Sequence, residues 1–253
     1  MNRVFFALIA LVLALAASGC VQATIETNLA ADGSGSLSMV YGMSAKTVEI
    51  MKELDALGGS QDLGNEMSML LADVDRAKLD AACAKHGVKV KKFEQTAPGG
   101  GTKVEMAFDF KSMEGLNAAL HEGMDRMDDG SFMVFKRADG NYVLRTAPKS
   151  SDAQDEDEET EEKAAEEFDP EKAGKLMEVM GKLMASVSEL AVTTRITVPG
   201  DVIEHNAPKL EGRTAIWEIN AENMMTAGAS MGSPEIVFSG KGLKFDAPAE
   251  AEE

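Results

Sequence analysis

The sequence predicts an α+β fold: a largely antiparallel β-sheet with helices packed on one face and a disordered acidic loop inserted. Segments of alternating and helical periodicity follow in the order β-β-α-α-β-β-α-β-β, acidic loop, α-β-β-β, without regular βαβ units. Turn sequences at 32–35 and 139–140 separate strands that are short enough to pair as hairpins. With 44% apolar residues, 253 residues suffice for a sizeable core.

The first 150 residues contain most of the predicted strands. The clearest half-buried strand is 104–111, where Val104, Met106, Phe108 and Phe110 alternate with charged or small residues. The other strands predicted here are 21–31, 37–43, 88–96, 132–136 and 142–146. Helices are predicted at 44–57, with Ser44 as N-cap, and at 66–71, 73–86 and 112–127.

Residues 151–167 have a different composition, with ten acidic residues, one lysine and no large apolar residue. Such a segment cannot bury enough apolar surface to order itself, so 151–168 is predicted to be a solvated, disordered loop. A contact of this loop with a divalent cation or a basic partner is the alternative.

A helix is predicted to begin at Pro170, after Asp169, and to lie on the sheet. Its apolar stripe is Leu176, Met180, Leu183, Val187 and Leu190. The neighbouring Met177, Met180 and Met184 are interpreted as core-filling residues; the alternatives are ligands for a soft metal and an adaptable apolar surface. The remaining predictions are strands at 192–198, 202–203, 214–220 and 235–239, a short helix at 221–227 and an acidic tail.

The first twenty residues resemble a bacterial lipoprotein leader. Arg3 precedes an apolar run of 14 residues, Val4–Ala17, which is too short to span a bilayer as a helix. The run closes with Ala17-Ser18-Gly19-Cys20, which is similar to a lipobox, where the cysteine is acylated and the leader is cut just before it. An ordinary signal peptide with an incidental cysteine is the alternative.

The chain is therefore divided into a signal peptide at 1–19, a first α+β part at 20–150, the acidic loop at 151–168, a completing part at 169–246 and a tail at 247–253. A lipid-anchored Cys20 with strand residues directly behind it holds the domain close to a membrane. If the source has two membranes, Val21 favours the outer one by resemblance to the usual sorting pattern.

Charge and cysteine content restrict the partners. The net charge is −18, and it becomes −19 when Arg3 leaves with the leader, so the chain repels nucleic acid. Once Cys20 is acylated, Cys83 has no partner for an internal disulfide, and it is interpreted as a buried small hydrophobic residue. No oligomeric state is predicted.

No constellation of residues indicates catalysis, and no cofactor or metal ligand is predicted. The three histidines, His86, His121 and His205, are far apart in the sequence, and His121-Glu122 lacks the second histidine of a zincin helix. His86 is interpreted as a stabilising residue at a helix C-terminus.

Residues 193–219 resemble the bacterial LppM-like lipoprotein domain family. The matching stretches are Ile196–Ala207, Glu211–Thr214 and Trp217, together with Cys20 and the turn at 32–35. The resemblance implies an envelope-anchored α+β domain without an assigned enzymatic activity and with an interaction or envelope-lipid role. Members often carry a membrane span near the C-terminus, where this chain has an acidic tail.

The loop residues Pro199, Gly200, His205 and Asn206 are the candidate partner-contact site, and a structural strand–bulge–strand unit is the competing interpretation. The sequence thus predicts a non-enzymatic, membrane-anchored envelope lipoprotein that binds an envelope lipid or protein. The alternatives are an envelope hydrolase that uses carboxylates in a cleft, and a soft-metal or cation-binding lipoprotein.

Overall fold

The computed structural model describes residues 21–57, 74–124, 132–146, 170–186, 190–223, 233–244 and 247–250. Several predictions concern residues outside these ranges: the leader with Cys20, the helix at 66–71, the acidic loop at 151–168 and most of the short helix at 221–227.

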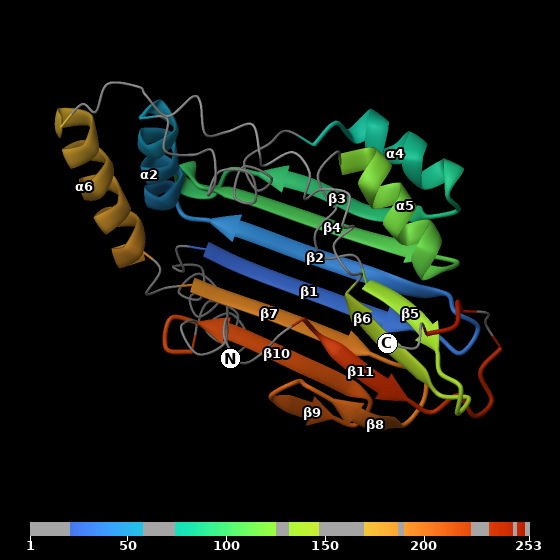
Figure 1. The fold of residues 1–253 in the computed structure, drawn as a ribbon. Helices are drawn as coiled ribbons and strands as arrows, with labels where there is room; N and C mark the ends of the chain where they lie inside the picture. The colour runs from blue at the N-terminus through green and yellow to red at the C-terminus, as the bar shows by residue number, and fades with distance from the viewer. Residues whose placement is uncertain are drawn as a thin grey trace, which may run out of the picture.

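A seven-stranded sheet forms the centre of the molecule and joins segments from both halves of the chain (Figure 1). Its order is β3-β4-β2-β1-β7-β10-β9, and every neighbouring pair is antiparallel except β1 and β7, which are parallel. The strands are β1 (Val21–Leu29), β2 (Gly35–Met43), β3 (Lys89–Thr96), β4 (Thr102–Phe110), β7 (Leu190–Thr197), β9 (Lys209–Glu211) and β10 (Thr214–Asn220). The one-turn 3-10 helix η1 (Pro98–Gly100) connects β3 to β4. The α+β prediction is confirmed.

One face of this sheet is covered by two different layers. Helices α4 (Arg76–Lys85) and α5 (Met113–Met124) lie over the β3–β4–β2 side (Figure 1). A second, four-stranded antiparallel sheet lies over the β1–β7–β10 side, in the order β5-β6-β11-β8. Its strands are β5 (Phe132–Lys136), β6 (Tyr142–Thr146), β8 (Val202–His205) and β11 (Glu235–Phe238). The helices predicted on one face are thus present, and the second sheet beside them was not predicted.

The main core lies between the large sheet and these two layers. Alternate residues of β4 point into it, and Phe108 is completely buried there. Leu79 of α4, Leu144 of β6 and Ile196 of β7 join the same cluster. Burying one such side chain contributes about 1.5–3 kcal/mol, so the period-two pattern read from the sequence fixes which face of each strand turns inward.

The opposite face of the large sheet is polar along β4. Glu105 is held there by ion pairs to Lys103 and Lys92 on either side of it. Hydrogen bonds from these two ammonium groups lower the pKa of Glu105 to about 2. The paired charges keep the carboxylate ionised.

Helices α2 (Ala45–Ala56) and α6 (Pro170–Ser186) form a separate pair at one end of the sheet (Figure 1). The side chain of Ser44 caps α2 by accepting a hydrogen bond from the Thr47 N–H, as predicted. The two helices bury a small cluster between them, which consists of Ile50, Met51, Leu54, Val179 and Leu183. Lys182 of α6 also forms an ion pair with Glu53 of α2 at 3.1 Å.

Two predictions for α6 are wrong. The helix packs on α2 and not on the sheet. Helix α2 directly follows β2 and lies between α6 and the end of the sheet (Figure 1). Met180 packs partly against the cluster, but Met177 and Met184 are 77% and 61% exposed, so they do not fill the core. Each lies one residue along from the packed stripe, which turns it about 100° around the helix axis and away from α2.

Candidate functional site

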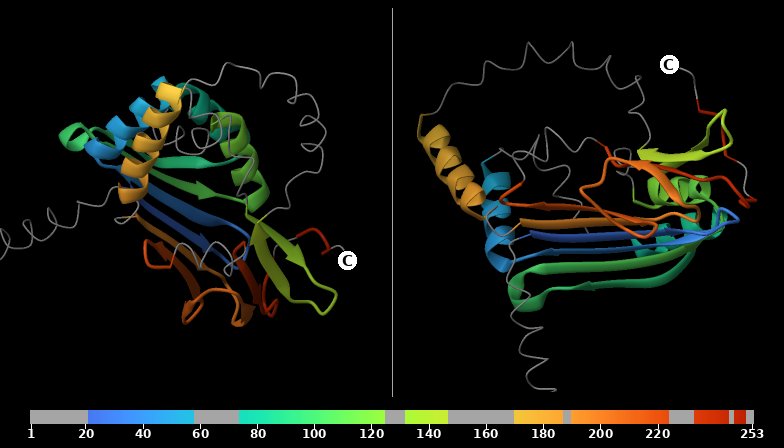
Figure 2. Two further views of the ribbon diagram at one scale, coloured as in Figure 1. Left: turned by 60° about the vertical axis from the view of Figure 1, so that its left-hand side comes forward. Right: turned by 90° about the horizontal axis from the view of Figure 1, so that it is seen from below.

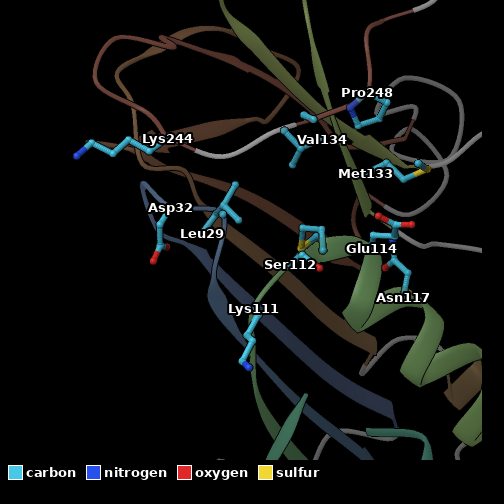
Figure 3. Close-up of a pocket in the computed structure, with 13 residues that line it drawn as sticks. Leu29, Asp32, Lys111, Ser112, Glu114, Asn117, Met133, Val134, Lys244 and Pro248 are labelled. Atoms are coloured by element: carbon cyan, nitrogen blue, oxygen red, sulfur yellow. The ribbon is translucent and has the colours of Figure 1, made fainter. Parts of the chain in front are cut away.

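A cavity of about 580 Å³ opens at the end of the large sheet opposite α2 and α6 (Figure 3). It lies where β1 ends at Leu29, whereas the α2–α6 pair adjoins the end where β1 begins. Its size is within the range of about 300–1,000 Å³ that is usual for small-molecule sites. Leu29, Met113 and Val134 provide a largely buried apolar wall.

The β1–β2 turn forms one side of the cavity. Gly33 adopts a φ of 83°, which a residue without a Cβ takes up at little cost. Asp32 accepts hydrogen bonds from the hydroxyl and the N–H of Ser34, and these bonds lower the pKa of its carboxyl group. Asp32 is therefore an ionised turn residue at the edge of the site.

The start of α5 forms a second side. Ser112 is its N-cap, because the hydroxyl accepts a hydrogen bond from the Gly115 N–H at 3.1 Å. One turn later, the Asn117 side chain donates to the Phe132 carbonyl at 2.8 Å and fastens α5 to β5. The first turn of α5 is thus held rigidly against the small sheet.

The C-terminal segment closes the third side. The Lys244 N–H donates to the Ala31 carbonyl at 2.9 Å, which ties this segment to the β1–β2 turn. Further on, the Lys136 N–H donates to the Pro248 carbonyl and the Glu250 N–H donates to the Lys136 carbonyl, at 2.8 and 2.9 Å. Part of the predicted acidic tail therefore runs along β5 as a short strand-like strip.

Positive charge lies at the rim. In Figure 3 the ammonium ends of Lys111 and Lys244 point away from the apolar wall. Among the described residues, neither of these two ammonium groups forms an ion pair or a hydrogen bond. Their apolar stems adjoin the cavity while the charged ends stay in water, an arrangement that long lysine side chains adopt readily. Glu114 and Asn117 lie together on another side of the cavity in the same view.

The arrangement suits an amphipathic anion. An acyl or alkyl chain gains free energy by entering the apolar wall, and an acidic headgroup at the rim can approach Lys111 or Lys244, whose ammonium groups have no ion-pair partner among the described residues. Asp32 and Glu114 are the carboxylates among the lining residues, and none of the lining residues is a histidine. The pairing of a carboxylate with His205 that a cleft hydrolase would use is not present in this cavity.

A second, more open hollow of about 1,010 Å³ lies on the outer side of the small sheet. Arg137 and Arg145 line it, and both form ion pairs with Glu250 at 3.5 Å. A carboxylate of the chain itself thus already meets the arginines, so this hollow is a weaker candidate than the cavity.

The residues predicted for partner contact lie elsewhere, and they interact with neighbouring strands. Pro199 accepts a hydrogen bond from Arg213 through its carbonyl at 2.5 Å. A Cβ on Gly200 would stand 2.2 Å from the carbonyl oxygen of Ser239, so only glycine fits between the two backbones. His205 ends β8, and its Nδ1 donates to the Ala207 carbonyl at 3.1 Å.

Asn206 holds three strands together. Its side-chain oxygen accepts from the Trp217 indole N–H at 3.2 Å and from the Glu235 N–H at 3.0 Å. Its amide nitrogen donates to the Ser233 carbonyl at 2.8 Å. This geometry favours the strand–bulge–strand interpretation of the motif, because the functional groups of Asn206 are turned towards the protein.

The other chemically notable residues are also in structural positions. Cys83 is a buried free thiol. Its pKa is raised mainly by burial and to a lesser extent by the nearby Asp80 carboxylate. His86 caps α4, and its Nε2 lies 2.9 Å from the Glu122 carboxylate, which Lys85 also contacts. Among the described residues, no group of three or more His, Cys, Asp or Glu side chains is arranged to hold a metal ion.

Sequence reasoning missed the cavity. Its lining comes from the β1–β2 turn, the start of α5, β5 and the C-terminal segment, which are far apart in the sequence. One signal was present: Lys111 directly follows Phe110, the last residue of the apolar strand β4.

Comparison with known proteins yields a distant likeness among solved structures. No family model matches the chain, and no curated protein matches it significantly. Among solved structures, the folded domain of the LppM protein of Mycobacterium tuberculosis, determined by NMR, aligns with a TM-score of 0.43 and 9% sequence identity. The alignment covers 87% of this chain and 90% of that domain, and the two folds resemble each other only distantly. None of the helices that the structure describes is long and apolar enough to cross a membrane.

Proposed function

We propose that the protein is a non-enzymatic, lipid-anchored lipoprotein of the bacterial cell envelope that binds an amphipathic anion, such as an acidic envelope lipid, in the cavity beside Leu29. The observation that carries the proposal is a buried apolar wall with two lysines at its rim whose ammonium groups have no ion-pair partner among the described residues. Anchoring through Cys20 is the part that rests on the leader sequence. We also propose that the chain belongs to the LppM-like family, because residues 193–219 resemble it.

The cavity lies far along β1 from the proposed lipid anchor. Strand β1 begins at Val21, one residue after Cys20, and reaches the cavity at Leu29. Eight steps of about 3.4 Å place the cavity roughly 27 Å from the anchored end. With β1 standing upright on the membrane, a ligand is held away from the bilayer surface, in a site open to another envelope component.

Competition binding tests the proposal with the purified full chain in detergent. A fluorescent fatty acid is bound first and is then displaced by alkyl phosphates of increasing chain length, with inorganic phosphate and an uncharged alcohol of the same length as comparison ligands. Affinity is expected to rise about fourfold for each added CH₂ until the cavity is full, because each buried CH₂ is worth about 0.8 kcal/mol. Inorganic phosphate should not compete.

The charge at the rim is tested by substitution. A double variant, Lys111→Gln with Lys244→Gln, is expected to weaken binding of the alkyl phosphate about fivefold and to leave the alcohol unaffected, since exposed charge pairs contribute about 0.5 kcal/mol each. Lys241→Gln, on the same C-terminal segment but outside the lining, is the matched control. Affinity that does not depend on chain length, or a control that behaves like the double variant, would refute the assignment.

A further inference from the structure

Helix α6 carries an apolar stripe on the side that faces away from α2. The stripe consists of Gly174, Met177, Gly181 and Met184, at spacings of three, four and three residues. The two methionines are the most exposed large hydrophobic side chains of the described residues, and a Cβ on either glycine would meet nothing within 4 Å. Residues at such spacings lie on one side of a helix, so they form a continuous surface.

Helix α6 is held in place by contacts of its opposite side, so the stripe itself takes no part in the packing. The opposite side of α6 is fixed to α2 by Val179 and Leu183, and Lys182 is paired with Glu53. Exposed methionine on a rigidly mounted helix has a cost in water, and methionine adapts well to irregular apolar partners. The exposed side of α6 is therefore a candidate docking surface.

The strand register identifies the end of the molecule where this surface lies. Val21, the first residue of β1, pairs with Met43 and with Leu190. Met43 directly precedes the N-cap of α2, and Leu190 is four residues beyond the end of α6. Both helices thus adjoin the end of the sheet where the chain emerges from Cys20. Helix α6 is the outermost element at that end, with α2 between it and the sheet (Figures 1 and 2).

We propose that the Gly174–Met177–Gly181–Met184 face of α6 lies on the lipid bilayer to which Cys20 is anchored. The inference rests on the proposed lipid anchor and extends it. The axis of α6 runs obliquely across the end of the sheet and not along the strands (Figures 1 and 2), so contact along the helix tilts the strands out of the membrane plane. That orientation presents the cavity at the far end of β1 to the space beyond the membrane. A zwitterionic surface suits the contact, because the net charge of −18 opposes an anionic one.

Depth-dependent quenching tests this proposal on the acylated protein that begins at Cys20. An environment-sensitive fluorophore is attached to Met177→Cys or Met184→Cys in a Cys83→Ala background, and the protein is inserted into phosphatidylcholine vesicles that carry a nitroxide on the upper acyl chain. Both labels are expected to shift to the blue and to lose intensity on insertion. Glu178→Cys, on the same helix but beside the stripe, and Asp139→Cys, in the β5–β6 turn, are the controls and should change little.

Each outcome decides a separate question. If the protein does not float with the vesicles at all, the lipid anchor fails, and the proposed function fails with it. If it floats but the stripe labels remain unquenched, the anchor stands and the bilayer contact is refuted. Labels that are already blue-shifted without vesicles show that another part of the chain or a second copy covers the stripe, which also refutes the proposal.

Discussion

Replacing Asn206 with alanine is expected to loosen the contact between the two sheets. Asn206 follows β8 of the small sheet, and its oxygen receives the indole N–H of Trp217 in the large sheet and the N–H of Glu235 at the start of β11. Its amide nitrogen binds the Ser233 carbonyl. The substitution removes three hydrogen bonds and leaves the indole N–H of a side chain that is only 4% exposed without this acceptor.

The size of the effect follows from these contacts. A net contribution of about 1 kcal/mol per hydrogen bond, together with the cost of about 1–3 kcal/mol for an unsatisfied buried donor, gives roughly 3 kcal/mol when the exposed members are discounted. This is a large part of the usual stability of a domain, about 5–15 kcal/mol. The variant should fold but should unfold at a clearly lower urea concentration.

Urea denaturation measures the loss, with far-UV circular dichroism as the signal shared by all variants. Trp217 is the only tryptophan, so its emission reports the same contact directly. Asn141→Ala, which removes one side-chain hydrogen bond in an exposed turn, is the matched control and should change the unfolding free energy by less than about 0.5 kcal/mol. A double-mutant cycle with Trp217→Phe should give a coupling energy of about 1 kcal/mol.

Two results would show that the reasoning is wrong. One is an Asn206→Ala variant as stable as the Asn141→Ala control. The other is a cycle in which the Asn206 and Trp217 substitutions are strictly additive, since additivity means that the two side chains do not interact. A normal stability combined with loss of a binding partner would restore Asn206 as a contact residue.

Three further predictions concern other parts of the fold. Gly200→Ala should destabilise the chain by about 2–4 kcal/mol in urea denaturation, because its Cβ would overlap the Ser239 carbonyl. Gly181→Ala, in an open helical position, should instead stabilise the chain by about 0.5–1 kcal/mol. Equal effects of the two substitutions would contradict this. Glu105→Gln should lower the free energy of unfolding by about 1 kcal/mol at neutral pH, because it removes the ion pairs. This difference from the wild type should fade as the pH falls from 4.5 towards about 2, where the native carboxylate becomes protonated. A difference that is constant with pH would exclude the ion pairs as its cause. Cys83 should resist a thiol reagent in the folded chain and react fully in urea, and rapid labelling without urea would disprove its burial.

The sequence predicted the elements whose signals are local. Strict alternation from Val104 to Phe110 gave β4, and Ser44 marked the start of α2, because side-chain period and capping depend on neighbouring residues only. The same information misplaced α6. Its amphipathic pattern showed that one side is buried, but a sheet and a helix can cover such a side equally well.

The cavity and the role of Asn206 depend on contacts between distant residues. Leu29 and Lys244 are separated by most of the chain, and they line one cavity because the C-terminal segment binds the β1–β2 turn. Asn206 was singled out for its loop sequence, and only its position between β10 and β11 shows that its amide is used within the protein. A side chain has the same chemistry in either setting, so the neighbours decide its role.

By itself the sequence determined the fold class and the positions of most strands, since hydrophobic period and turn residues are properties of continuous segments. The lipoprotein-like leader lies outside the described residues and stays a prediction. Only the tertiary structure decided that β1 and β7 are parallel neighbours, that a second sheet shares the core face, and that an apolar helix side and a cavity lie at opposite ends of β1. These features arise from the pairing of remote segments. Their free energy comes from surfaces that meet only after the chain has folded.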